Sequence, residues 1–204
     1  MVPCNVGGLN WSGYAFDPEL GLLVANVNNL PAKVKLIPRS EFQSPARQAE
    51  KGEYTEQQGA PYGLFRNLLQ APSGFPCGPP PWGMLTAVDL AKGTIRWQVP
   101  LGSMEHFGGS REHVPAGSIS LGGPIVTAGG LIFIAGTVDP FLRAFDIETG
   151  KLLWEAPLPA SGAATPMTYQ LGATGKQFVV IAAGGHAKIT EEGQSDTLIA
   201  FALP

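Results

Sequence analysis

The chain has 204 residues and a formal net charge of -3, with 13 basic and 16 acidic side chains scattered along its length. Because this charge is small and dispersed, it offers no basic surface for nucleic acid or for anionic lipid. Glycine (27 residues) and proline (19) are enriched, and no apolar run approaches the ~20 residues of a membrane helix, so the composition predicts an all-β protein with many turns and no membrane span.

The N-terminal residues Met1–Cys4 have neither the charged nor the apolar region of a signal peptide. If the protein is exported, we therefore expect its export signal to lie upstream. Two cysteines, Cys4 and Cys77, stand in loops rich in proline and glycine. A disulfide between them fits an oxidising compartment and two thiols fit the cytosol, and the sequence leaves both possibilities open.

The first predicted element is a hairpin around Ala15–Gly21, which reads AFDPELG. Aspartate and glycine are turn residues, so this pattern predicts an outgoing strand, a tight turn and a returning strand. The segment from about Arg39 to Pro81 then interrupts the strand pattern with a polar run at 50–59 and a proline run at 79–81. We interpret it as a long loop insertion.

A sequence motif at Ala87–Trp97, AVDLAKGTIRW, recurs at Ala144–Trp154 as AFDIETGKLLW, after an interval of 57 residues. We call this motif the repeated phrase. The hairpin at Ala15–Gly21 resembles a third copy, with Ala25 at the tryptophan position, and a fourth copy at Leu198–Leu203 breaks off. Because 72 residues separate the starts of the hairpin and the phrase that follows it, we attribute the extra length to the insertion. Self-similarity at a long fixed period predicts a repeat architecture.

Further strands precede the later copies, at residues 123–127 and 130–136 and at residues 164–169 and 177–184. Four short strands per ~55 residues, bounded by glycine and proline, are typical of the four-stranded blades of a β-propeller. Trp97 and Trp154 are expected to be packing residues whose rings cover the backbone of the next repeat. Propellers have ~4–8 blades and this chain supplies three to four, so we interpret residues 1–204 as the C-terminal fragment of one larger propeller domain.

Other patterns that carry chemistry are missing from the sequence. His106 and His113 lie seven positions apart, which is no standard metal spacing, and we interpret them as parts of a solvated loop. The chain contains no Gly-x-Ser-x-Gly elbow, phosphate-binding loop or His-Glu-x-x-His motif.

Several longer motifs, spread in order over nearly the whole chain, resemble one family. They are Gly7–Gly13, Leu36–Arg39, Pro76–Asp89, Leu121–Pro124, Gly136–Asp139, Leu142–Asp146, Ala164–Tyr169 and Ala183–His186. Together they resemble the C-terminal part of the quinoprotein dehydrogenases that use pyrroloquinoline quinone (PQQ), in particular the membrane-bound glucose and quinate/shikimate dehydrogenases.

This resemblance implies an eight-bladed propeller with PQQ and a divalent cation, calcium or magnesium, near its axis. It implies oxidation of a sugar or cyclitol hydroxyl, with electrons passed to ubiquinone or another acceptor, on the periplasmic side of the inner membrane. The cofactor carries the redox chemistry and the protein orients it. Most of the family's active-site residues, including the metal ligands and the catalytic aspartate, would lie upstream, so we expect this fragment to need the rest of the propeller and to be inactive alone.

The resemblance assigns cofactor contacts to Asn10, Trp11, Asp139 and His186, and it assigns no metal ligand within the chain. Asp139 would have an auxiliary catalytic role near the quinone and would pair with a lysine that this chain does not contain. Each assignment has a structural alternative: Asn10 as a turn cap with Trp11 as a packing residue, Asp139 as a turn residue before proline, and His186 as a solvated loop residue.

Two alternative functions remain open at this point. A non-catalytic propeller scaffold that binds protein partners would share the repeated phrase, although it has no reason to combine Asn10, Trp11, Asp139 and His186. A quinoprotein alcohol dehydrogenase with a haem partner is the other alternative, and the lack of a Cys-x-x-Cys-His motif in this chain argues only weakly against it.

Overall fold

The structure is a computed structural model, and it describes residues 1–4, 7–9, 11–45, 49–104, 117–172, 175–186 and 193–203. The described chain is almost entirely β, with one short helix, α1 (Arg39–Phe42). None of the helices in these ranges is long and apolar enough to cross a membrane. His106 and His113 lie outside the described residues.

Three antiparallel sheets follow one another along the chain, and we call them the first, second and third blades. The first blade has the order β1-β2-β6-β7 and consists of β1 (Tyr14–Asp17), β2 (Leu22–Asn28), β6 (Gly83–Asp89) and β7 (Thr94–Pro100). The second has the order β8-β9-β10-β11 and consists of β8 (Ile125–Val126), β9 (Leu131–Ile134), β10 (Phe141–Asp146) and β11 (Leu152–Pro157). The third has the order β12-β13-β14 and consists of β12 (Met167–Gln170), β13 (Gln177–Ala183) and β14 (Thr197–Ala202).

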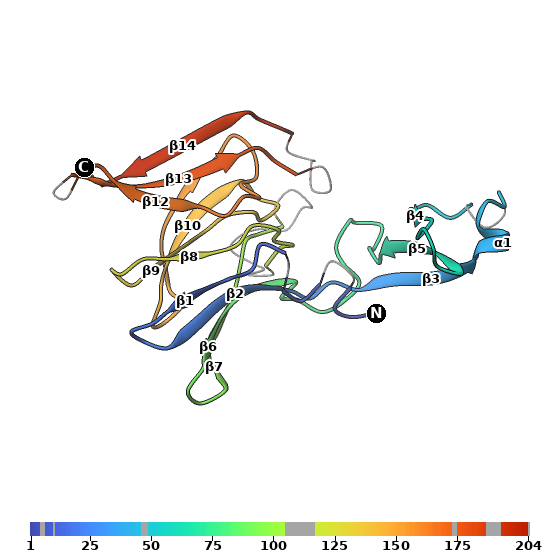
Figure 1. Ribbon diagram of the computed structural model, residues 1–204, viewed down its shortest axis with the longest axis horizontal. Coiled ribbons are helices and arrows are strands. Elements are labelled where there is room, and N and C mark those ends of the chain that lie inside the picture. Colours follow the sequence, from blue (N-terminus) through green and yellow to red (C-terminus); the bar gives the residue numbers. More distant parts are fainter. Residues whose placement is uncertain are drawn as a thin grey trace.

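The blades pack against one another through their faces, and the hydrophobic core lies between them (Figure 1). Between the first and second blades, Val24 and Leu85 are fully buried against Ile132 and Ile134. Between the second and third, buried Leu142 meets Ile181. This stacking of antiparallel sheets of four, four and three strands confirms the prediction of an all-β partial propeller.

The repeated phrase occupies an unexpected place in the first blade. The structure confirms the hairpin at Ala15–Gly21, but its strands β1 and β2 lie in the same sheet as β6 and β7, which carry the phrase at Ala87–Trp97. The hairpin is therefore not a separate repeat: it forms the first half of the blade that β6 and β7 complete, and the insertion lies within this blade, between β2 and β6. The likeness comes from a shared turn, because Gly21 and Gly93 both adopt the left-handed conformation four residues after an aspartate.

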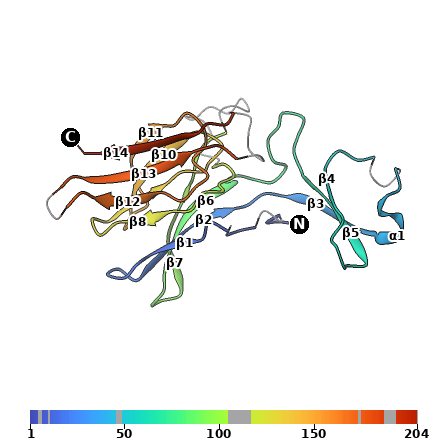
Figure 2. The same ribbon diagram turned by 45° about the horizontal axis from the view of Figure 1, so that its top comes forward.

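The segment expected as a long loop folds largely into a fourth sheet, which we call the side sheet. It has the order β3-β5-β4 and consists of β3 (Ala32–Pro38), β5 (Tyr62–Leu68) and β4 (Glu53–Thr55). It begins before Arg39 and projects away from the blades in both views (Figures 1 and 2). Ile37, Phe42 and Phe65 form a small hydrophobic core within the side sheet. This core explains why a segment so rich in polar residues folds into a sheet.

Cys4 lies near the N-terminus, and Cys77 lies in the part of the insertion between β5 and β6. No disulfide joins Cys4, which is buried among Leu30, Ala32 and Trp82, to Cys77, which is exposed. In the structure both residues are therefore thiols.

Candidate functional site

The topology gathers one set of loops at a single end of the blades. In an antiparallel four-stranded blade, the start of the first strand, the end of the second, the start of the third and the end of the fourth share one end. This end, which we call the site end, carries the residues before β1, the loop between β9 and β10, the residues before β12 and those after β13. Three of the four sequence-predicted site residues, Trp11, Asp139 and His186, lie there, and Asn10 lies outside the described residues.

Trp11 and His186 are brought together from blades that are not adjacent. Trp11 precedes β1 of the first blade and His186 follows β13 of the third, yet their ring centroids are 6.3 Å apart with an interplanar angle of 52°. Trp11 is 74% exposed, which is unusual for so large an aromatic residue. An exposed aromatic ring beside an imidazole provides both a stacking surface and hydrogen-bonding groups for a planar ligand.

The three blades come into close contact beside this aromatic pair. A side chain at Gly123, before β8, would place its Cβ 2.3 Å from the carbonyl oxygen of Ser12 and 3.0 Å from Oγ1 of Thr165. Only glycine fits there, since such a Cβ would collide with the backbone of the first blade. The buried Oγ of Ser12 has no hydrogen-bond partner among the described residues, so a polar group remains to be satisfied next to Trp11.

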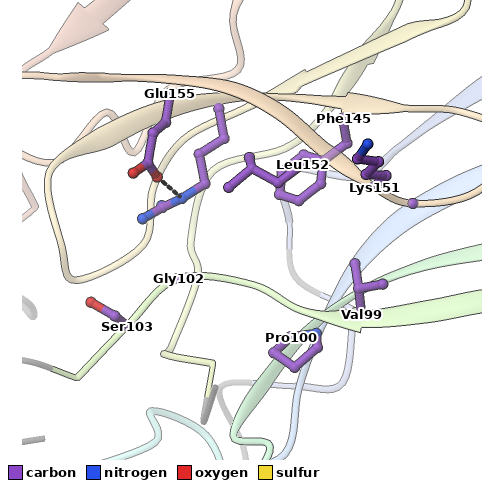
Figure 3. A pocket seen from close by; sticks show the side chains of 10 residues that line it. Val99, Pro100, Gly102, Ser103, Phe145, Lys151, Leu152 and Glu155 are labelled. Atoms are coloured by element: carbon purple, nitrogen blue, oxygen red, sulfur yellow. Dashed lines mark ion pairs between the residues drawn. The ribbon is translucent and has the colours of Figure 1, made fainter. Parts of the chain in front are cut away.

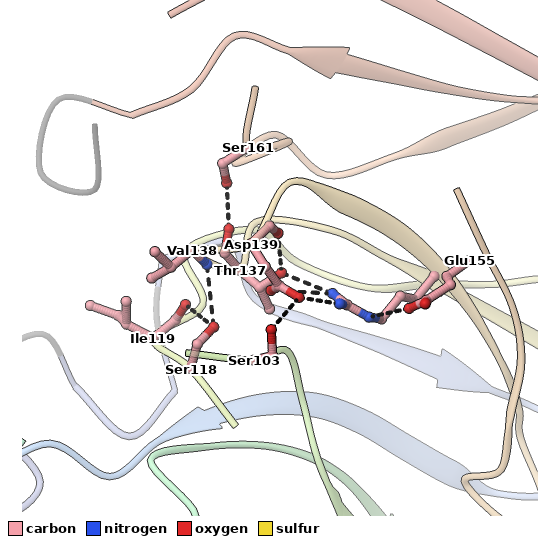
Figure 4. Close-up of polar contacts among 9 residues, drawn as sticks. Ser103, Ser118, Ile119, Thr137, Val138, Asp139, Glu155 and Ser161 are labelled. Atoms are coloured by element: carbon pink, nitrogen blue, oxygen red, sulfur yellow. Dashed lines mark hydrogen bonds and ion pairs between the residues drawn. The ribbon is translucent and has the colours of Figure 1, made fainter. Parts of the chain in front are cut away.

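Asp139 lies in a separate, buried polar cluster at the same end (Figure 4). Its carboxylate forms an ion pair with Arg143, and the two side chains are only 6% and 4% exposed. Ser103, which follows β7 of the first blade, donates its hydroxyl to Oδ2 of Asp139 at 3.2 Å. The partner of Asp139 in this chain is thus Arg143 rather than the lysine expected from the resemblance.

Thr137 extends this cluster to the third blade. Its Oγ1 accepts a hydrogen bond from Nη1 of Arg143 at 3.0 Å and donates to the main-chain oxygen of Asp139 at 2.9 Å. Its own carbonyl accepts a 2.7 Å hydrogen bond from the hydroxyl of Ser161. Because every member is buried, loss of one partner would leave an uncompensated charge or donor, which typically costs about 3–5 kcal/mol for a buried ion pair.

The outer side of the cluster opens into a pocket of about 390 Å³ between the first and second blades. Figure 3 shows Leu152 and Phe145 between Lys151 at one end of the pocket and Glu155 at the other, with Val99 and Pro100 opposite. The pocket reaches Arg143, whose Nε lies 3.3 Å from Oε2 of Glu155.

Sequence reasoning missed Arg143, Glu155, Ser103 and Thr137. One signal was present, because Arg143 stands between the apolar residues of the strand FLRAFD, and a charged residue at a buried position of a strand needs a partner. Ser103 and Glu155 gave no such signal, since their positions depend on how the blades pack. The described residues contain no group of three or more His, Cys, Asp or Glu side chains placed to hold a metal ion.

Comparison with known proteins agrees with this fold. Residues 1–179 match the family model for the β-propeller domain of PQQ-dependent glucose, ethanol and alcohol dehydrogenases. The chain is 41% identical, over its full length, to a quinoprotein glucose dehydrogenase of Escherichia coli K12, and it covers 26% of that protein. It is 38% identical to a quinate/shikimate dehydrogenase (quinone) of Acinetobacter baylyi, with 98% of the chain and 26% of that protein covered.

A solved structure is similar as well. The quinohemoprotein alcohol dehydrogenase of Comamonas testosteroni superposes with a TM-score of 0.66 at 25% identity, and the match covers 98% of this chain and 27% of that one. The chain therefore spans about a quarter of the length of its relatives.

Proposed function

Since the chain belongs to the family of PQQ-dependent dehydrogenase β-propeller domains, we propose that the complete protein oxidises a sugar or cyclitol hydroxyl with PQQ as cofactor. Glucose and quinate are the substrates named for two relatives about 40% identical to it. A quinone, ubiquinone or a similar acceptor, receives the electrons. This chain supplies part of the propeller and needs the remainder for activity.

The observation that carries the proposal is the meeting of Trp11 and His186 at the site end. PQQ is a planar aromatic quinone with carboxylate groups, so it requires an aromatic surface and hydrogen-bond donors. The exposed Trp11 ring and the His186 imidazole fit both requirements. The neighbouring Oγ of Ser12, buried and without a hydrogen-bond partner in the described part of the chain, is a further polar group at this place.

Each residue has a separate task in this proposal. Bound PQQ supplies the acceptor for the hydride that leaves the hydroxyl-bearing carbon. Trp11, with Asn10 beside it in sequence, contacts the cofactor from the first blade, and His186 contacts it from the third. Gly123 keeps the adjoining backbone close enough for these two blades to meet. Asp139, in the loop between β9 and β10 at the same end of the blades, acts as an auxiliary catalytic residue.

Two further parts of the proposal concern the setting of the site. A divalent cation, calcium or magnesium, accompanies PQQ, and residues upstream of this chain provide most of its ligands. The parent protein acts on the periplasmic side of the inner membrane.

The experiment uses the complete protein with PQQ and calcium. Cofactor binding is followed by quenching of tryptophan fluorescence, and dye-linked oxidation is measured with glucose and with quinate. We expect His186→Asn and Trp11→Phe each to weaken PQQ binding about tenfold, which corresponds to loss of one good polar or aromatic contact. Trp154→Phe, on the outer strand β11, is the matched control and should bind PQQ as the wild type does.

The outcomes separate the alternatives. Binding of PQQ without turnover of either substrate would leave the cofactor site in place and refute the substrate class. If the complete protein does not bind PQQ, the propeller is a scaffold and the roles of Asn10, Trp11, Asp139 and His186 are wrong.

A further inference from the structure

The carboxylate of Asp139 is held almost entirely by one side chain. Two nitrogens of the Arg143 guanidinium face the two carboxylate oxygens, with Nη1 3.5 Å from Oδ1 and Nη2 bonded to Oδ2. Such a two-point contact fixes both the place and the orientation of a carboxylate, which a single point charge does not. Ser103 adds one hydrogen bond from the first blade.

Arg143 is itself held from the opposite side. Its Nε pairs with Glu155 on the outer strand β11, and Nη1 donates to Thr137, so each of its three nitrogens has an acceptor. Glu155 is 26% exposed at the pocket between the blades, whereas Arg143 and Asp139 are buried. A row of alternating charges, Glu155, Arg143 and Asp139, thus runs from the outer surface to the site end (Figure 4).

We propose that Arg143 is the positioning residue for Asp139, with Glu155 as the outer support that keeps the guanidinium in place. This inference rests on the proposed function, because Asp139 acts on the cofactor region only if PQQ binds at the site end. Arg143 would contact neither substrate nor cofactor. Its effect on the reaction would pass through Asp139 alone.

The structure favours this role over a purely structural one for two reasons. The pair joins residues only four positions apart, so it does little to close the fold, and the links between blades are made by Ser103, Ser161 and Thr137 instead. Arg143 also commits its paired nitrogens to Asp139 although a single contact would suffice to neutralise the charge.

The test is a double-mutant cycle in the complete protein. Arg143→Lys keeps the charge but loses the two-point contact, and we expect kcat to fall about tenfold, KM for the sugar to stay within about twofold, and PQQ affinity of the apoprotein to weaken at least about threefold. Asp139→Asn should lower kcat at least as much. Adding Arg143→Lys to Asp139→Asn should change kcat less than about twofold, because Arg143 acts through the carboxylate.

Two further variants make the result specific. Glu155→Gln leaves the buried pair intact and should shift kcat and PQQ affinity in the same direction by a smaller factor, so the test survives if Arg143→Lys fails to fold. Arg96→Lys, an exposed arginine on β7, is the matched control and should leave both values unchanged.

The failures of the two proposals are distinguishable. If the complete protein neither binds PQQ nor oxidises a sugar or cyclitol, the proposed function is wrong. If it does both, but Arg143→Lys and Glu155→Gln only lower the melting temperature, or the effects of Arg143→Lys and Asp139→Asn multiply independently, Arg143 is structural and this inference is overturned.

Discussion

Trp97 donates its indole N–H to the main-chain oxygen of Ile147 in the second blade at a distance of 2.8 Å. The same ring covers Gly150, where an added Cβ would lie 2.6 Å from a ring carbon. This contact confirms that the tryptophan of the repeated phrase covers the backbone of the next blade. Trp154 occupies the corresponding place in the second blade and meets Phe201 of the third, with ring centroids 5.3 Å apart.

The hydrogen bond of Trp97 gives the first prediction. Trp97→Phe keeps most of the ring but leaves the oxygen of buried Ile147 without this donor, and we expect the free energy of unfolding to fall by about 1–3 kcal/mol. Trp154→Phe is the control, because Trp154 makes no indole hydrogen bond to the described residues and should lose less. The measurement is chemical denaturation of the complete protein, and equal losses for the two variants would contradict the prediction.

Two glycines with the same conformation give the second prediction. Gly150 and Gly93 end equivalent turns with φ angles of +70° and +66°, but only Gly150 lies under a neighbouring ring. Gly93→Ala should lose about 1–2 kcal/mol through the left-handed backbone alone. Gly150→Ala has the same backbone strain and also displaces Trp97, so it should lose clearly more in the same denaturation assay. If both alanine variants are equally stable, the ring contact contributes nothing.

The contact between the end of β2 and the second blade gives the third prediction. Asn28 donates Nδ2 to the carbonyl oxygen of Ser120 at 3.0 Å and accepts the Ser120 N–H at 2.9 Å, and both residues are almost fully buried. Asn28→Ala leaves the Ser120 N–H unpaired and its carbonyl oxygen with only the longer bond from Nδ2 of Asn26 at 3.3 Å, so we expect a loss of about 1–3 kcal/mol. Asn67→Ala removes an exposed amide bonded to the carbonyl of Lys51 and should change stability by less than about 0.5 kcal/mol.

The turn between β10 and β11 gives a pH dependence. The Thr149 hydroxyl, 2.6 Å from Oδ1 of Asp146, and the Thr149 N–H, at 2.8 Å, hold the pKa of this carboxyl below its usual range. A lowered folded-state pKa stabilises the protein above the unfolded pKa of about 3.9, and that contribution is lost as pH falls through the folded value. Because the carboxyl is solvated, the effect should be small.

The measurement is the melting temperature of the complete protein between about pH 6 and pH 2.5, which brackets the ordinary aspartate pKa. Thr149→Val removes the stronger hydrogen bond and should reduce the loss of melting temperature on acidification. Glu148→Gln, in the same turn, is the control for removing a nearby charge. A Thr149→Val profile parallel to that of the wild type would show that the hydroxyl does not stabilise the carboxylate.

Sequence alone determined the local parts of this protein. The aspartate and glycine of the repeated phrase predicted hairpins at Ala15–Gly21, Ala87–Trp97 and Ala144–Trp154, and all three form. It also predicted the blade-to-blade packing of Trp97, because turn chemistry and side-chain size are properties of a few neighbouring residues. The motif resemblance led to the correct family.

Only the tertiary structure decided which strands share a sheet and which charges meet. β2 pairs directly with β6, although the whole side sheet separates these two strands in sequence. Two similar hairpins therefore lie in one blade, and no local pattern specifies a pairing between strands so distant in sequence. Likewise, Asp139 meets Ser103 from another blade, and Trp11 meets His186 from a non-adjacent one. These contacts depend on how the blades pack, since burial of their apolar faces fixes the positions of polar residues at their ends.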